Sequence, residues 1–246
     1  TAIGNHALGA NTEGEDNVAV GSNSLDANTT GSDNVALGTS ALGANTTASN
    51  NTAVGNRALL INTTGTNNVS VGSEALENNT TGSGHVAVGR EALHLNTTGS
   101  ENTAMGYGAL ANNTTGDYNT GIGREALQMN TTASSNTAVG YQALEENTTG
   151  SGNTAVGSQA LDANTTGNNI TAIGYTLIGT DAGHATTVGN TNTVVGRAGL
   201  YTNVGGDRNV AIGYHSLYFF NPSGNNVDTY NTAIGHTALQ FCSTGI

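Results

Sequence analysis

Apolar and polar positions alternate along this chain in a pattern that returns every 17 residues. A glycine closes each phrase, and the consensus is N-[TV]-A-[VIL]-G-x-x-A-L-x-x-N-T-T-G. The glycines of this series are Gly4, Gly21, Gly38, Gly55, Gly72, Gly89, Gly106, Gly123, Gly140, Gly157 and Gly174. The apolar phrase before the glycine alternates with period 2, which predicts a short β-strand in each repeat. A fixed period without a slip predicts units that stack on their neighbours.

Two aliphatic columns accompany the glycines, and we expect them to form a continuous core. The residue before the glycine is Ile3, Val20, Leu37, Val54, Val71, Val88, Met105, Ile122, Val139, Val156 or Ile173. Four residues after the glycine the chain has Leu8, Leu25, Leu42, Leu59, Leu76, Leu93, Leu110, Leu127, Leu144 or Leu161. Charged residues just after the glycine (Arg57, Glu74) and just after the leucine (Glu77, Glu145) are expected to face solvent.

The repeat is too short for a helix-turn-helix unit and lacks the leucine-rich-repeat pattern. We therefore predict an all-β fold, a parallel β-solenoid in which each repeat forms one coil and glycines lie at corners where φ is positive. Two asparagine columns, one containing Asn11 and Asn28 and the other Asn17 and Asn34, are predicted to form hydrogen-bonded ladders between coils.

The spacing changes after Gly174, which divides the chain into a regular part (1–174) and an irregular part (175–246). The next glycines of the series are Gly196, Gly213 and Gly235. The steps from Gly174 to Gly196 and from Gly213 to Gly235 are each five residues longer than the repeat. We therefore infer two five-residue insertions on otherwise regular coils.

The second insertion lies in an aromatic segment, residues 218–230. Loops on a rigid scaffold often carry recognition, and the candidate receptor contacts are Tyr218, Phe219, Phe220 and Tyr230. The structural alternative is a lid over the last coils.

Charge and composition exclude several classes of partner. The net charge is -12, with 17 acidic residues, five arginines and no lysine. Nucleic acids and anionic membrane surfaces both require a basic surface, so neither is an expected partner. A single cysteine, Cys242, excludes an internal disulfide framework, and no apolar run reaches membrane-spanning length. The chain begins without Met inside a repeat phrase, which suggests a processed chain or a piece of a longer tract.

Candidate chemistry is sparse. Asn-Thr-Thr is a glycosylation sequon, and the candidate glycosylation sites are Asn28, Asn45, Asn62, Asn79, Asn96, Asn113, Asn130, Asn147 and Asn164. The alternative is that these residues form turns and ladders. The threonine columns also resemble the regular arrays of ice-binding solenoids. The six histidines lack zinc-like spacing, the acids form no column for calcium, and no nucleophile, base and orienting acid can be grouped. We expect no metal, no cofactor and no enzymatic activity.

The phrases Asn17-Val18-Ala19-Val20-Gly21 and Asn153-Thr154-Ala155-Val156-Gly157 resemble the head repeats of YadA-like trimeric autotransporter adhesins and repeat tracts of bacteriophage tail fibres. The resemblance covers nearly the whole chain through one short motif. It implies a left-handed parallel β-roll, a homotrimer and a role in surface attachment. The repeat is longer than the adhesin head repeat, and the chain has no heptad stalk and no membrane-anchor barrel.

These observations predict a non-enzymatic extracellular fibre or adhesin module, located at a cell surface or in a virion tail. Its expected partners are other copies of itself and a host-surface receptor or glycan. The alternative is a structural protomer that polymerises head to tail into a filament, because an uncapped solenoid exposes a strand edge at each end.

Overall fold

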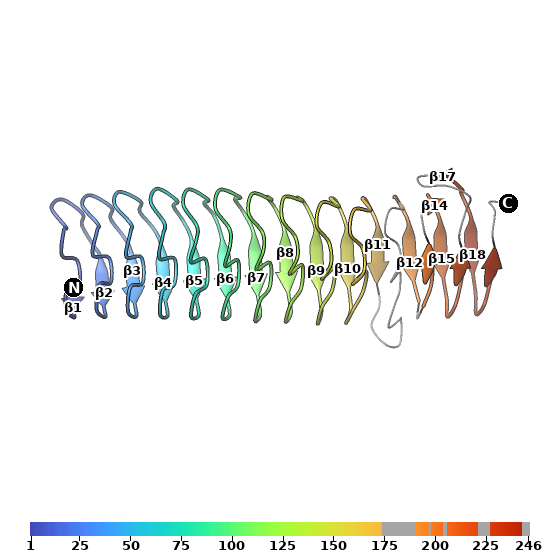
Figure 1. The fold of residues 1–246 in the computed structure, drawn as a ribbon, viewed down its shortest axis with the longest axis horizontal. Helices are drawn as coiled ribbons and strands as arrows, with labels where there is room; N and C mark the ends of the chain where they lie inside the picture. Colours follow the sequence, from blue (N-terminus) through green and yellow to red (C-terminus); the bar gives the residue numbers. More distant parts are fainter. Residues whose placement is uncertain (174–189, 197, 204–205, 221–226, 243–246) are drawn as a thin grey trace. The chain divides into compact units, whose positions relative to one another are not determined.

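The repeats fold as coils of a parallel β-solenoid, as the sequence predicts (Figure 1). The structure is a computed structural model that describes residues 1–173, 190–196, 198–203, 206–220 and 227–242. The chain divides into two compact units, Thr1–Asn119 and Thr120–Ile246. The predicted boundary at residue 174 adjoins a segment outside the described residues and stays a prediction.

The first unit contains seven short parallel strands, each paired in register with the strand of the neighbouring repeat. They are β1 (Ala2–Ile3), β2 (Val18–Val20), β3 (Val35–Leu37), β4 (Thr52–Val54), β5 (Val69–Val71), β6 (Val86–Val88) and β7 (Thr103–Met105). Backbone hydrogen bonds also join the coils outside the strands. The N–H of Leu42, for example, donates to the carbonyl of Ala58 at 3.0 Å.

The second unit continues the same pattern in its described residues. Its main sheet contains β8 (Thr120–Ile122), β9 (Thr137–Val139), β10 (Thr154–Val156), β11 (Thr171–Ile173), β12 (Thr193–Val195), β15 (Val210–Ile212) and β18 (Thr232–Ile234). Two smaller parallel sheets contain β13 (Thr202–Asn203), β16 (Phe219–Phe220) and β19 (Phe241–Cys242), and β14 (Gly206–Asp207) with β17 (Val227–Asp228).

Both inferred insertions are confirmed by the strand register of the second unit. Thr171 pairs with Thr193, and Val210 pairs with Thr232, so each of these steps is five residues longer than the repeat. Between them, β12 and β15 pair at the regular period, with Thr193 opposite Val210. The strand column therefore continues in register across both longer steps.

The glycine that ends each strand makes the corner, as predicted. Gly72 has φ +137°, and a Cβ built on it would lie 2.5 Å from the carbonyl oxygen of Gly89 in the next coil. An L side chain strains this conformation and would also clash with backbone. The position of this glycine therefore sets where the corner falls in each repeat.

One of the two predicted core columns is correct and the other is wrong. The leucines four residues after the glycine are fully buried from Leu25 to Leu161, and Leu8 in the first coil is half-buried. The aliphatic residues before the glycine face outward instead: Leu37 is 46% exposed and Met105 41%. In each three-residue strand the middle residue is buried, and that residue is alanine in most coils.

The narrow interior of the coil explains this orientation. Where β12 places Val194 inward, the alanine usually found three residues after the glycine is replaced by Gly199. A Cβ on Gly199 would lie 3.0 Å from Cγ1 of Val194. The coil therefore accepts two small residues, most often two alanines, or one valine with one glycine, and the larger aliphatic side chains point to solvent.

Both predicted asparagine ladders are present, with different geometry. In the first, Nδ2 of Asn45 donates to Oδ1 of Asn28 in the preceding coil at 2.9 Å and to the carbonyl of Ala48 at 3.0 Å. In the second, Oδ1 of Asn34 accepts the backbone N–H of Asn51 at 3.0 Å. Both columns are buried, so their amides supply the hydrogen bonds that the interior cannot obtain from water.

Candidate functional site

The outward sheet face of the first unit is mostly apolar, with threonine only at the first position of β4 and β7. We define it as the first and third residues of β2 to β7. It includes Val18, Val35, Val69 and Val86 at first positions, all between 36% and 38% exposed. The third positions add Val20, Leu37, Val54, Val71, Val88 and Met105. An ordered apolar patch of this kind typically marks an interaction site.

The second unit has a sheet face of different composition. Threonine occupies the first outward position in β8 to β12, whereas the third position remains aliphatic. Ile122, Ile173, Ile212 and Ile234 are all exposed there. This face therefore carries one hydroxyl column beside one aliphatic column.

The predicted aromatic contacts fall into two separate groups in the second unit. Tyr218 stacks on Tyr201 with ring centroids 4.8 Å apart, and Phe219 stacks on Phe241 at 5.1 Å. Tyr218 and Phe219 meet edge to face at 4.5 Å. Phe219 and Phe241 are 44% and 73% exposed, so this group presents aromatic surface to solvent.

Tyr230 belongs to the other group. It is 65% exposed, its hydroxyl donates to Oδ2 of Asp228 at 3.3 Å, and the Arg208 guanidinium lies 5.4 Å from the centre of its ring. The backbone of Phe220 lies in β16, while its side chain is outside the described part of the chain. The structure thus brings Tyr218 and Phe219 together and places Tyr230 in another, polar setting.

The sequon asparagines lie inside the folded coil. All nine, Asn28, Asn45, Asn62, Asn79, Asn96, Asn113, Asn130, Asn147 and Asn164, are 0% exposed. Their Nδ2 atoms donate hydrogen bonds inside the coil, as Asn62 does to Asn45 and Gly65. A glycan on Nδ2 would displace these bonds and has no room in the folded coil. The ladder predicted for this column is present, and the glycosylation of these residues stays a prediction.

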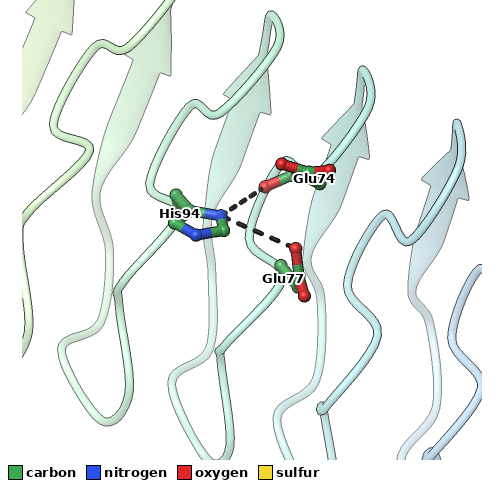
Figure 2. A group of neighbouring side chains, drawn as sticks. All are labelled: Glu74, Glu77 and His94. Atoms are coloured by element: carbon green, nitrogen blue, oxygen red, sulfur yellow. Dashed lines mark hydrogen bonds and ion pairs between the residues drawn. The ribbon is translucent and has the colours of Figure 1, made fainter.

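A polar cluster that was not expected from the sequence lies on the side of the first unit, and Figure 2 shows three of its residues, Glu74, Glu77 and His94. Glu77, expected to face solvent, is only 4% exposed. Its Oε1 forms an ion pair with Nη2 of Arg57, and its Oε2 lies 3.7 Å from Nδ1 of His94. The same Nδ1 lies 3.2 Å from the backbone carbonyl oxygen of Glu74.

The signal for this cluster lies in the phase of the repeat rather than in local spacing. Glu77 and His94 occupy the same position in consecutive coils, and Glu74 occupies the position of Arg57 one coil later. Stacking of successive repeats therefore groups four residues that are scattered along the sequence between positions 57 and 94.

A second acidic group lies in a hollow of the second unit, which is lined by Glu145, Glu146 and Asp162 together with Ala163 and Thr165. Burial, with the neighbouring Glu125 carboxylate, raises the pKa of Glu145 above its usual value. The carboxylates of Glu145, Glu146 and Asp162 are hydrogen-bond acceptors that all carry negative charge.

Comparison of the chain with protein-family models, with curated proteins and with solved structures finds no match. Among the described residues, no helix is long and apolar enough to cross a membrane.

Proposed function

We propose that this chain is a non-enzymatic solenoid module of an extracellular fibre or adhesin, in which copies associate side by side through the outward sheet face. The observation that carries the proposal is the outward aliphatic column, one residue per coil, whose members are half-buried or exposed in both units. Burying apolar surface contributes roughly 25 cal/mol per Å², and a regular column lets this contribution add from coil to coil.

The form of the surface supports association with another regular, rigid partner. Successive strands pair in strict register, so the exposed side chains are repeated at the spacing of neighbouring β-strands, about 4.8 Å. A second copy of the same chain has the matching repeat. The resemblance to trimeric adhesin heads and tail-fibre tracts favours a homotrimer.

Attachment to a host receptor or glycan would use a different part of the chain. The exposed rings of Phe219 and Phe241 lie outside the outward sheet face and remain available in a laterally associated module. Flat, exposed rings suit contact with the apolar face of a sugar or with a receptor side chain.

Light scattering after size exclusion tests the association. We expect the purified chain to elute as a discrete oligomer, and the double variant Val69→Lys, Val86→Lys to elute as a monomer. Both valines are already exposed in the single chain, so lysine fits without a loss of folding, whereas two charges in a lateral interface are costly.

The matched control carries the same two lysines outside the sheet, as Thr64→Lys, Thr81→Lys, at exposed positions of the corresponding coils. It should keep the mass of the parent. A monomeric parent contradicts the proposal, and the threonine column of the second unit would then justify a test for ice binding by thermal hysteresis. Long fibres that both variants still form would favour head-to-tail polymerisation instead.

A further inference from the structure

Three potential metal ligands converge on the side of the first unit, away from its sheet. One ligand atom each from Glu74, Glu77 and His94 lie within 4.8 Å of one another. Figure 2 shows Glu74 and Glu77 on one coil and His94 approaching them from the next. The cluster involves none of the residues of the outward sheet face, so it is independent of lateral association.

The backbone holds the two contributing coils together at this point. The N–H of Leu76 donates to the carbonyl of Ala92 at 2.9 Å. The backbone N–H and the side-chain Nδ2 of Asn78 both donate to the carbonyl of His94, at 3.2 and 2.9 Å. The Cα positions of the ligands are thus fixed by inter-coil hydrogen bonds, and little ordering is required when an ion binds.

The donor set is one imidazole nitrogen and two carboxylate oxygens, which are ligands that zinc and its first-row neighbours accept. Around a tetrahedral zinc ion, ligand atoms at about 2.1 Å lie about 3.4 Å apart. The three atoms must therefore approach one another by up to about 1.4 Å, which rotations of the partly exposed Glu74 and His94 side chains can supply. Calcium and magnesium are weaker candidates because they prefer all-oxygen sites.

The charge of Glu77 gives the second argument. Its carboxylate is buried, and a buried charge is costly unless it is paired. Arg57 forms its ion pair with Oε1, so Oε2, on the side of His94, is available to bind an ion. A cation held between Oε2 and Nδ1 would satisfy the second carboxylate oxygen as Arg57 satisfies the first.

We propose that Glu74, Glu77 and His94 form a binding site for a divalent transition-metal ion of the zinc class, with the remaining coordination position taken by water. Because its ligands come from two consecutive coils, the bound ion links these coils. Without a metal, Nδ1 of His94 itself contacts Oε2 of Glu77 and the backbone carbonyl of Glu74, and the experiment separates these two arrangements.

The test is calorimetric titration of the full chain, without a histidine tag, with zinc chloride at pH 7.5. We expect one zinc ion per chain and at least about tenfold weaker binding by His94→Ala. This variant is a mild one, since Ala111 occupies the same position in the next coil. Glu74→Gln, which copies Gln142 of a later coil, should also weaken binding.

The control is His6→Asn, which removes a histidine outside the cluster and copies the equivalent Asn23. It should bind zinc as the parent does. The visible absorption of bound Co²⁺ provides a second readout, and its ligand-field bands should be lost in His94→Ala. Zinc binding that is absent from the parent, or unchanged in His94→Ala, overturns the proposal. Equal binding of Ca²⁺ and Zn²⁺ would also overturn it, because it would indicate carboxylates acting without the imidazole.

Discussion

At the residue scale, His85 shows how a different side chain can serve in an asparagine column. It is fully buried at a position where other coils have Asn68 or Asn102. Its Nδ1 accepts the N–H of Asn102 at 3.2 Å, as an asparagine Oδ1 does in the neighbouring coils. Its other ring nitrogen, Nε2, lies 3.2 Å from Nδ2 of Asn96, and the ring also hydrogen-bonds the backbone of Gly99. The neutral imidazole thus keeps the hydrogen bond that this column makes to the next coil.

This substitution predicts an acid-sensitive coil. Burial lowers the pKa of His85 from 6.5 to about 4. Because the pKa of His85 is lower in the folded chain than in the unfolded chain, the stability due to neutral His85 is fully present above pH 6.5. It is lost as the pH falls from 6.5 through about 4, by about 3 kcal/mol in total.

Urea unfolding at pH 7.5 and pH 4 measures this effect as a difference between the parent and His85→Asn. We expect the variant to lose less free energy of unfolding on acidification, since asparagine does not titrate. The carboxylates titrate in both proteins and cancel in the comparison. Equal losses would mean that His85 is protonated without cost in the folded chain.

At the scale of the element, the strand and the asparagine ladder are the units that define a coil. Asn62 illustrates the ladder: Nδ2 donates to Oδ1 of Asn45 at 3.1 Å and to the carbonyl of Gly65 at 2.9 Å, and Oδ1 accepts from Asn79 at 2.9 Å. An amide at this position therefore connects three consecutive coils.

Removal of one ladder amide should be costly. We expect Asn62→Ala to lower the free energy of unfolding by about 2–3 kcal/mol, because buried groups of Asn45 and Asn79 lose a partner. Thr64→Ala, at an exposed position of the same coil, is the control and should change stability by less than about 0.5 kcal/mol. Thermal or urea unfolding compares the two, and similar values would show that the ladder contributes no net stability.

The sequence predicts the strands, the period, the corner glycines and the insertions, because each depends on one residue type returning in one phase. It does not predict which side of the strand is buried. In Val35-Ala36-Leu37 every residue is apolar, and only the volume of the coil interior decides that Ala36 is inside. The burial of Glu77 is missed for a related reason, since it depends on Arg57 and His94 in the adjacent coils.

At the scale of the whole molecule, the repeat makes each unit modular. Each coil contacts its neighbours through the same strand, leucine and asparagine columns, so stability is approximately a sum of coil and interface terms. A deletion or insertion of a whole number of repeats should preserve the fold. One of any other length should move every column beyond it out of register.

Two deletions in the first unit test this modularity. Deletion of residues 39–55 removes one full repeat and joins Gly38 to Asn56, so Leu25 should stack on Leu59. We expect the circular dichroism spectrum of a folded solenoid and a modest loss of stability. Deletion of residues 39–54 removes one residue fewer than the repeat and should unfold this region or lower its stability far more. A similar result for both would show that the columns do not set the register.

The asparagine ladders have a consequence for the chemical ageing of the molecule. Asparagine deamidates when the backbone nitrogen of the next residue attacks the side-chain carbonyl carbon, which requires the amide to rotate freely. In Asn28, Asn45 and Asn62 the amide is held on both sides and buried. A chain so rich in asparagine is therefore chemically durable while it is folded. A coil that opens exposes its amides to a reaction that prevents it from closing again, since aspartate in place of the Nδ2 donor would oppose one oxygen acceptor to another.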